Sequence, residues 1–194
     1  MNLIEYLRSF GKIAIALSGG VDSTYLAYAA KQSGILCKAY TVKSQFVPQF
    51  ELEDAKQIAE FIDIPLKIID IDVLEYDDIT SNPSNRCYYC KHRVFTTISE
   101  HARRDGFTIL CDGTNASDDI DDRPGMKAIA ELSVKSPLQE CNLTKTMIRK
   151  LAHKADLFTW DKPSYACLAT RIQPGQQITI NDLIHIERAE GYLF

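Results

Sequence analysis

Long apolar runs are missing from this sequence of 194 residues, and none approaches the roughly 20 residues that a helix needs to cross a bilayer. The first residues also lack a charged segment followed by a long apolar stretch, so we expect no signal peptide. Repeats and low-complexity segments are absent as well. These absences argue against a membrane protein, and we expect the chain to reside in the cytoplasm.

An excess of basic residues is missing too. The chain carries 22 lysine and arginine residues against 26 aspartate and glutamate residues, and its net charge is −4. Proteins that bind nucleic-acid backbones usually display a basic excess or a basic stripe. We therefore expect a small-molecule substrate and no nucleic-acid partner, in a chain long enough for one domain with a small appendage.

Six cysteines are present, which we expect to be reduced in the cytoplasm and therefore available as metal ligands or nucleophiles. Cys37 lies within one predicted strand and Cys111 ends another, so both are interpreted as small core residues. Cys141 lies in no pattern that assigns it a role.

Short apolar runs, which predict strands, alternate along the chain with amphipathic segments, which predict helices. Strands are predicted at 13–17, 36–42, 66–71, 107–111 and near Val134, and helices at 2–10, 22–33, 51–62, 86–104, 126–132 and 144–155. The alternation predicts an α/β fold, in which right-handed crossovers join a parallel sheet that carries helices on both faces. The regular alternation of strand-like and helix-like segments is interrupted at Pro163, Pro174 and Gly175. We therefore predict a main domain at 1–163 and the start of a small C-terminal unit at 164–194.

The first predicted strand ends in Ser-Gly-Gly-Val-Asp-Ser, residues 18–23, directly before a predicted helix. The two glycines allow a sharp turn, and the amide groups at the start of the helix form an anion-binding nest. The pyrophosphate half of ATP fits such a nest, with the Ser18 and Ser23 hydroxyl groups as donors and Asp22 as a ligand of Mg²⁺. The ATP-binding residues predicted from this segment are Ser18, Gly19, Gly20, Val21, Asp22 and Ser23.

This segment is neither a Walker A loop nor a dinucleotide fingerprint, because both glycine patterns are absent. A strand-to-helix turn capped by Asp22 and Ser23, with no ligand, is the alternative interpretation. The segment resembles the loop of the pyrophosphate-loop ATP hydrolases, such as GMP synthetase, NAD synthetase and the tRNA-thiolation enzymes. The resemblance implies that an oxygen nucleophile attacks the α-phosphate, pyrophosphate leaves, and a second nucleophile displaces AMP from the adenylate.

A Cys-x-x-Cys pair stands at Cys87 and Cys90, about one helical turn apart, and we predict that the basic residues 91–93 lower the thiol pKa values. The pair alone is typical of zinc, iron–sulfur or redox sites, and it also occurs as a structural coincidence. A second Cys-x-x-Cys, which a four-thiolate zinc site needs, is absent. Together with Cys167, three thiolates suit a [4Fe–4S] cluster that leaves one iron open.

From residue 86 onward the sequence resembles the LarE-type ATP-dependent sulfur transferases, which help to build a nickel-pincer cofactor. The segments that carry this resemblance are Arg86-Cys-Tyr-Tyr-Cys-Lys91, Asp112-Gly-Thr-Asn-Ala116, Asp118, Asp121, Arg123-Pro-Gly125, Ser136-Pro-Leu138, Lys145, Ile148-Arg149, Trp160-Asp-Lys-Pro163, Ala166-Cys-Leu-Ala-Thr-Arg171, Ile186-Glu187 and Ala189-Glu190. With residues 18–23 they extend over nearly the whole chain.

The resemblance implies that a carboxylate of a pyridinium dicarboxylate mononucleotide is adenylated and then converted to a thiocarboxylate. Cys167 is implied either as the sulfur donor, which becomes dehydroalanine, or as a ligand, with Cys87 and Cys90, of a cluster whose open iron carries a sulfide. Because this chain has all three cysteines, we favour the cluster. Asp22 and Cys167 are the catalytic candidates, and ATP, Mg²⁺ and a [4Fe–4S] cluster are the implied substrate and cofactors.

Further ATP-binding positions follow from the same resemblance. Gly113 and Thr114 come directly after a predicted strand, where nucleotide contacts are expected. Asp118 is expected to hold Mg²⁺ or to orient phosphates, and the alternative is a solvated loop acid. Ser44 is expected to reach the adenylate or else to cap a loop.

In the C-terminal unit, Arg171 is expected to clamp a phosphate or carboxylate of the substrate, and Glu190 to join the same site. For both residues a solvated surface position is the alternative. The chain departs from the family pattern at Ser117 and at residues 172–175. Relatives continue beyond the last residue of this chain, so we expect the second unit to be incomplete, and the family also implies a homo-oligomer.

Other functions are compatible with the motifs. A tRNA-thiolating enzyme also combines this loop with cysteines, but it calls for a basic surface. A non-catalytic nucleotide or metal sensor would bind ATP without releasing pyrophosphate. An amide-forming synthetase that uses ammonia would not need the three cysteines.

Overall fold

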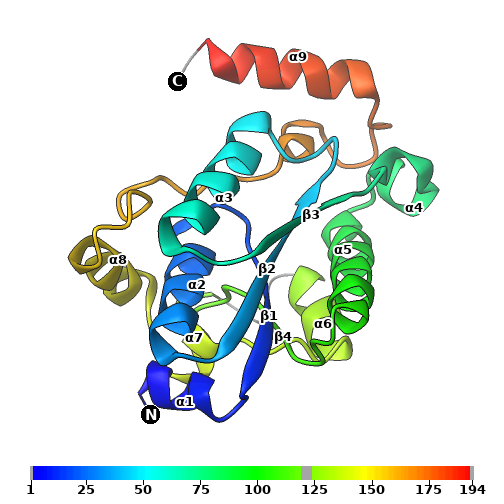
Figure 1. Cartoon of the computed structure of the whole chain (residues 1–194). Helices are drawn as coiled ribbons and strands as arrows, with labels where there is room; N and C mark the ends of the chain where they lie inside the picture. Colours follow the sequence, from blue (N-terminus) through cyan, green and yellow to red (C-terminus); the bar gives the residue numbers. More distant parts are fainter. Residues whose placement is uncertain (1, 119–123, 193–194) are drawn as a thin grey trace.

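The computed structural model describes residues 2–118 and 124–192. At its centre lies a four-stranded sheet in the order β3-β2-β1-β4, in which every pairing is parallel (Figure 1). The strands are β1 (Lys12–Ala16), β2 (Leu36–Lys43), β3 (Leu66–Asp70) and β4 (Leu110–Cys111). A parallel sheet in an alternating chain confirms the predicted fold class.

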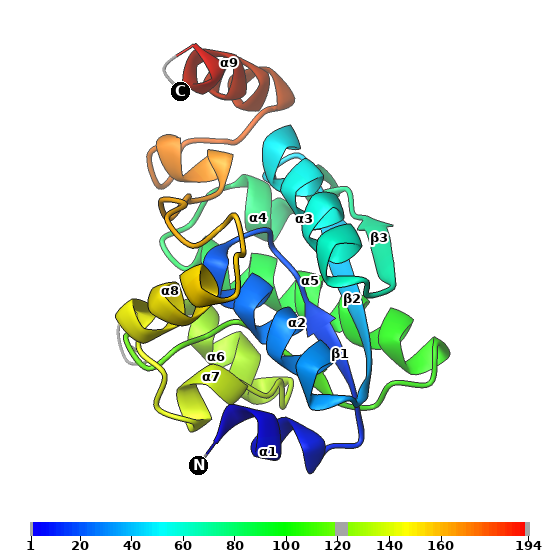
Figure 2. The same cartoon turned by 60° about the vertical axis from the view of Figure 1, so that its left-hand side comes forward.

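Helices cover both faces of this sheet. Their bounds are α1 (Leu3–Arg8), α2 (Val21–Ser33), α3 (Gln49–Ile62), α4 (Asp77–Thr80), α5 (Arg86–Arg104), α6 (Pro124–Glu131), α7 (Pro137–Glu140), α8 (Lys145–Lys154) and α9 (Ile180–Gly191), with 3₁₀ turns η1 (Val73–Glu75) and η2 (Leu168–Arg171). Helices α1, α2, α3, α7 and α8 cover one face, and α5 and α6 cover the other (Figure 1, Figure 2). Within the described part of the chain, no helix combines the length and the apolar character that crossing a membrane requires.

Two hydrophobic cores, one on each face of the sheet, explain the apolar runs of the central strands. Ile13 and Ile15 of β1 pack in one core with Leu26 of α2. Ala14, between them, packs in the other core with Phe95 of α5. Because both faces of β1 are buried, its sequence is continuously apolar, as expected for a strand in a parallel sheet.

The position of β1 decides where a ligand can bind. The β1–α2–β2 crossover lies on one face of the sheet, whereas the β3–α5–β4 crossover lies on the other, and β1 stands between β2 and β4. In open parallel sheets such a change of direction opens a crevice at the carboxyl ends of the strands. Residues 18–23, which follow β1, and residues 112–114, which follow β4, flank this crevice.

Two predicted strands differ from the structure. Phe107 N donates to Ala102 O and so belongs to the turn that ends α5, which leaves β4 only two residues long. Near Val134, an isolated parallel bridge between Cys111 and Lys135 stands in place of the predicted strand. Each segment has a buried apolar residue, Phe107 or Val134, and hydrophobicity alone does not distinguish a loop with a buried side chain from a short strand.

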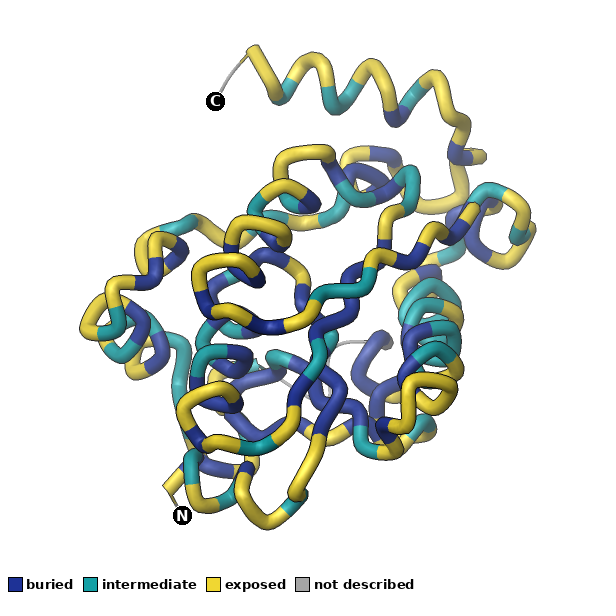
Figure 3. Tube along the Cα trace, in the orientation of Figure 1, coloured by how far each residue is buried: buried dark blue, intermediate teal, exposed yellow. Residues whose placement is uncertain are grey.

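The last described residues, 164–192, contain η2 and α9. Five apolar side chains of this segment pack in the core on the α5 face: Leu168, Ala169, Ile172, Ile178 and Leu183. Helix α9 itself is largely exposed (Figure 3), with Leu183 as its buried residue. The domain boundary near residue 163 stays a prediction.

Candidate active site

The segment 18–23 leaves β1 and turns sharply into α2. Gly19 has a φ of +80°, and a Cβ at this position would lie 2.8 Å from Glu51 O, so the turn requires glycine twice over. Ser23 Oγ accepts a hydrogen bond from Ser18 N at 3.2 Å. Gly20 is the N-cap residue of α2 and supplies no side-chain cap, which leaves the first amide groups of the helix to an anion.

Asp22 carries a half-buried carboxylate, and only one of its two oxygens has a hydrogen-bond partner among the described residues. Lys145 Nζ donates to Asp22 Oδ2 at 2.5 Å, whereas Oδ1 is buried and has no hydrogen-bond partner among the described residues. Burial raises the pKa of Asp22, and the hydrogen bond and charge of Lys145 oppose this rise. Mg²⁺ would supply the missing partner of Oδ1, so the chemistry of this carboxylate fits a magnesium ligand.

Gly113 lies two residues after the end of β4, and its backbone packs closely against the start of α2. A Cβ at residue 113 would lie 2.8 Å from Ser23 N and 3.2 Å from Asp22 C. These are backbone atoms of the phosphate-binding segment, and they move only if that segment moves. Glycine is therefore required here by close approach.

The Gly113→Ala variant is expected to lose about 1–3 kcal/mol of folding free energy, as overpacked sites do, and to bind ATP more weakly. The added methyl group displaces the backbone at Ser23. Thermal unfolding and nucleotide titration measure the two effects. Gly191→Ala is the matched control, because a Cβ there meets no atom within 4 Å. Unchanged melting temperature and ATP affinity in Gly113→Ala would contradict the close approach.

A cavity of about 530 Å³ opens at the carboxyl ends of β1, β2 and β4. Its volume is within the range of small-molecule sites. The sequence-predicted residues that line it are Ser18, Gly20, Asp22, Ser23, Ser44, Gly113, Thr114, Asp118, Cys90 and Cys167. The structure thus brings residues of the glycine turn at 18–23 and two thiols to one cavity. Gly19, Val21 and Cys87 are not among its lining residues, and Val21 is buried in the core.

The loop after β4 is ordered around a buried carboxylate. Asp112 is only 5% exposed, and its oxygens accept hydrogen bonds from Thr114 Oγ1 at 2.6 Å and Ser136 Oγ at 2.7 Å. Asp118 Oδ2 accepts from Asn115 N at 3.0 Å. These bonds hold Thr114 and Asp118 at the cavity wall. Of the residues that carry the family resemblance, 121 and 123 lie outside the described residues.

Arg86 joins the two cysteine segments. Its guanidinium is buried, and Nη1 donates to Asn82 Oδ1 and to Ala169 O, both at 2.8 Å. Nη2 lies 3.9 Å from Cys167 Sγ. The start of α5, which carries the Cys-x-x-Cys pair, is thereby fixed against the segment that carries Cys167.

The predicted lowering of the thiol pKa values by the basic residues 91–93 is wrong for Cys90. Burial raises the pKa of Cys90 to about 12, with the neighbouring thiols adding to the rise and Arg86 opposing it. Burial also raises the pKa of Cys167, and there too Arg86 opposes it. Burial prevails at Cys90 because it penalises the charged form directly, and the positive charges of Arg86 and Lys91 offset only part of this penalty.

The three thiols have the chemistry of cluster ligands, and a cluster that all three share stays a prediction. Cys90 and Cys167 are half-buried and line the same cavity, whereas Cys87 is exposed and is not among its lining residues. Thiolates are the usual ligands of iron–sulfur clusters. Across residues 2–118 and 124–192, no three His, Cys, Asp or Glu side chains are grouped to hold a single metal ion.

The two predicted substrate-binding residues contact each other. Arg171 Nε donates to Glu190 Oε1 at 2.6 Å, and neither residue lines the large cavity. Tyr165, which does line it, donates its hydroxyl to Glu190 Oε2. The Arg171–Glu190 pair therefore contacts Tyr165, a lining residue of the cavity, without lining the cavity itself.

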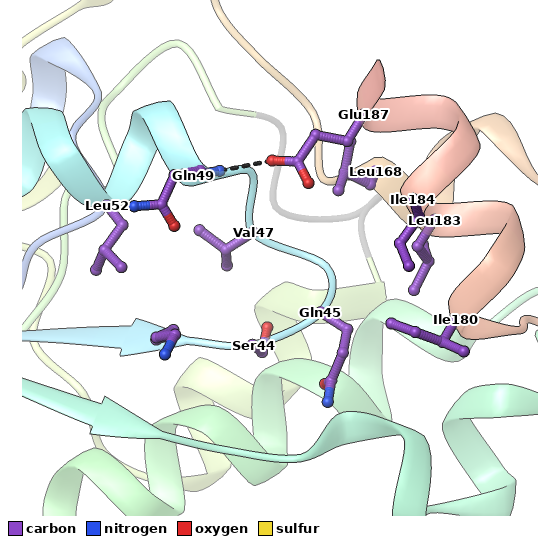
Figure 4. A pocket seen from close by; sticks show the side chains of 11 residues that line it. Ser44, Gln45, Val47, Gln49, Leu52, Leu168, Ile180, Leu183, Ile184 and Glu187 are labelled. Carbon is purple, nitrogen blue, oxygen red and sulfur yellow. Dashed lines mark hydrogen bonds between the residues drawn. The ribbon is translucent and has the colours of Figure 1, made fainter. Parts of the chain in front are cut away.

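A second, smaller cavity of about 190 Å³ lies between α9 and the segment from β2 to α3 (Figure 4). It shares Ser44 and Val47 with the large cavity. Glu187 of α9 crosses its rim and accepts a hydrogen bond from Gln49 N at 2.8 Å, which caps the start of α3 (Figure 4). This contact holds α9 beside the carboxyl end of β2.

Sequence reasoning gave no role to several residues that the structure places at the site. Lys145 contacts Asp22, Lys162 contacts Gly19 O, and Glu51 and Tyr165 line the large cavity. Each of them comes from a segment distant from residues 18–23, so no local spacing marks it. Lys145 and Lys162 did lie within the family motifs, which was the only available signal.

Glu51 gives the site a pH-dependent feature. Burial raises the pKa of its carboxyl group to about 7 from the ordinary 4.5, and Lys162 opposes the rise. The folded state therefore holds the proton more tightly than the unfolded state, and this stabilisation is lost as the pH rises through 7. The Glu51→Gln variant, which cannot ionise, is expected to raise the melting temperature more at pH 8 than at pH 5.

Thermal unfolding of Glu51→Gln at both pH values checks this expectation. Glu60→Gln, which removes an exposed carboxylate from the same helix, is the control. An equal gain for Glu51→Gln at pH 5 and pH 8 would show that the carboxyl group ionises normally in the folded protein.

Comparison with known proteins agrees with this geometry. The family of the queuosine biosynthesis protein QueC matches residues 12–86. The uncharacterized protein slr1717 of Synechocystis sp. is 36% identical over 99% of this chain and 72% of its own length. The pyridinium-3,5-bisthiocarboxylic acid mononucleotide synthase of Lactiplantibacillus plantarum is 29% identical over 98% of this chain and 70% of its own length. The NMN synthetase of Francisella tularensis has the same fold, with a TM-score of 0.65 at 17% identity over 98% of this chain and 92% of that one.

A parallel sheet whose first strand ends in this glycine turn, with a cavity above it, defines a pyrophosphate-loop enzyme of the ATP-using class. Within that class the chain is a homologue of the pyridinium-3,5-bisthiocarboxylic acid mononucleotide synthase, and it belongs to the same family as slr1717.

Proposed function

We propose that the protein is an ATP-dependent sulfur transferase that adenylates a carboxylate of a pyridinium dicarboxylate mononucleotide and converts it to a thiocarboxylate, in the synthesis of a nickel-pincer cofactor. The observation that carries this proposal is that the pyrophosphate segment and the thiols of Cys90 and Cys167 line the same cavity. Activation and sulfur delivery can then act on one bound substrate.

In the first step a carboxylate oxygen of the acceptor attacks the α-phosphorus of ATP, and the bond to the β-phosphate breaks. The amide groups at the start of α2 and the hydroxyl groups of Ser18 and Ser23 receive the departing pyrophosphate. Asp22 would hold Mg²⁺, which when bound would supply positive charge to offset that of the leaving group. Gly113, Thr114, Ser44 and Asp118 complete the nucleotide site.

In the second step sulfur attacks the acyl carbon, and AMP leaves with one oxygen of the original carboxylate. Cys87, Cys90 and Cys167 would hold a [4Fe–4S] cluster, which supplies an open iron for a donor sulfide when bound. The buried Arg86 guanidinium beside Cys167 offsets the negative charge that three thiolates bring. Arg171 and Glu190 are proposed to hold the acceptor at the edge of the cavity, beside Tyr165.

Iron and acid-labile sulfide in protein purified without oxygen test the cysteine part of this proposal. About four irons per chain are expected in the wild type, and their loss in Cys87→Ala, Cys90→Ala and Cys167→Ala, as a three-thiolate site requires. Cys141→Ala, a cysteine of the opposite core, is expected to retain the iron. Wild-type protein without iron would refute the cluster and leave Cys167 itself as the sulfur donor to be tested.

A further inference from the structure

Lys162 makes three contacts with the phosphate-binding region from a segment far along the chain. Its Nζ donates to Gly19 O at 3.2 Å and forms an ion pair with Asp54 of α3. The ammonium group also lies 5.1 Å from the ring centre of Phe50. The side chains of Lys162 and Asp54 are only 17% and 23% exposed. A cation enclosed in this way keeps a fixed position, unlike a surface lysine.

The contact with Gly19 O decides which way a peptide group of the nest points. In a trans peptide the carbonyl of one residue and the N–H of the next point in opposite directions. Because Lys162 holds Gly19 O on the α3 side, Gly20 N–H points the other way, toward Ser18 Oγ on the cavity wall. That bond is long, 3.4 Å, and an anion in the cavity can replace it.

Because residue 19 is a glycine, the orientation of the Gly19–Gly20 peptide group needs a contact that fixes it. A residue with φ of +80° and no Cβ has little intrinsic preference between the two orientations of its peptide group. If the Gly19–Gly20 peptide turned over, its carbonyl oxygen would face the phosphate and repel it. Lys162 stabilises the orientation that offers the N–H.

The backbone that carries Lys162 is itself held in place. Arg149 of α8 donates from Nη1 to Trp160 O at 2.8 Å and from Nη2 to Lys162 O at 2.6 Å. A continuous series of contacts therefore runs from α8, through residues 160–162, to the Gly19 carbonyl.

We propose that Lys162 is a positioning residue for pyrophosphate: it fixes the Gly19–Gly20 peptide so that the nest accepts the β- and γ-phosphates of ATP. The inference rests on the proposed ATP-dependent function and deepens it. Lys162 acts through the backbone of the nest. Its removal therefore affects ligands that carry the pyrophosphate group and spares AMP, which lacks it.

Calorimetric titration of the Lys162→Met variant with magnesium pyrophosphate, Mg·ATP and AMP separates these ligands. We expect at least a tenfold weaker affinity for pyrophosphate and ATP, and an AMP affinity within twofold of the wild type. Lys162→Arg, which can still donate to Gly19 O and Asp54, is expected to recover most of the loss. Asp54→Asn, which frees the ammonium group, is expected to show the same pattern more weakly, and Lys154→Met, the loss of an exposed lysine, is expected to change nothing.

Two results would overturn this inference while the proposed function stands. One is wild-type affinity for pyrophosphate in Lys162→Met, and the other is an equal loss for AMP and pyrophosphate, which would indicate a general structural defect. Wild-type protein that binds neither Mg·ATP nor pyrophosphate would instead refute the proposed function itself.

Discussion

Replacement of Asp22 by asparagine is expected to lower acceptor-dependent pyrophosphate release by about 10²–10³-fold, the loss seen when one preorganised electrostatic contact of a transition state is removed. The asparagine keeps the shape of the side chain but removes the charge that we propose binds Mg²⁺. It also leaves the Lys145 ammonium group without its anionic partner. The negative charge that develops on the departing pyrophosphate in the transition state is then no longer offset, so the rate of pyrophosphate release falls.

Pyrophosphate release measured with a coupled assay at saturating ATP tests this expectation, with thermal unfolding as the check on folding. Asp63→Asn is the matched control. Asp63 is exposed and has a positive φ that asparagine also adopts, so the same change there should leave activity intact. Activity of Asp22→Asn within threefold of the wild type would show that magnesium is held elsewhere.

Replacement of Cys167 by serine is expected to abolish thiocarboxylate formation, with a loss of at least about 10³-fold, because a hydroxyl group neither donates sulfur nor serves as a cluster ligand. Adenylation is expected to persist, since the residues that bind ATP and magnesium are unchanged. The variant should therefore release pyrophosphate in the presence of the acceptor but form no sulfur-containing product, as mass spectrometry would detect.

Cys37→Ala is the control for this prediction, because Cys37 is a core residue of β2 on the opposite side of the sheet from Cys167. It is expected to lower stability and leave sulfur transfer intact. Thiocarboxylate formation by Cys167→Ser at the wild-type rate would remove Cys167 from the chemistry. Loss of pyrophosphate release together with sulfur transfer would mean that Cys167 contributes to the nucleotide site.

Local sequence predicted the parts of the site that are built locally. Residues 18–23 are recognisable because strand, turn and helix start follow one another in a single segment, and the glycines mark the turn. Lys145 and Lys162 acquire their roles only through folding. They contact Asp22 and Gly19 across 123 and 143 positions, and no spacing rule connects residues so far apart.

Burial and the shortness of some elements explain other differences between prediction and structure. The basic residues after Cys90 suggested an easily ionised thiol, but the pKa of Cys90 is raised because the folded chain encloses it. Sequence reasoning gave Glu51 no role, yet it lines the cavity with a raised pKa. The four-residue helices α4 and α7 are too short to produce a helical period in the sequence.

Transfer of ¹⁸O from the acceptor tests the central claim, the formation of an acyl adenylate, most directly. The enzyme is given Mg·ATP, a sulfur source and a pyridinium dicarboxylate mononucleotide whose carboxylates are labelled with ¹⁸O. An adenylate route leaves one labelled oxygen on AMP, because the carboxylate oxygen that attacks the α-phosphorus departs with it. AMP that carries one ¹⁸O, with unlabelled pyrophosphate, is the predicted result. Unlabelled AMP, or label in a phosphate released from the γ-position, would contradict the account.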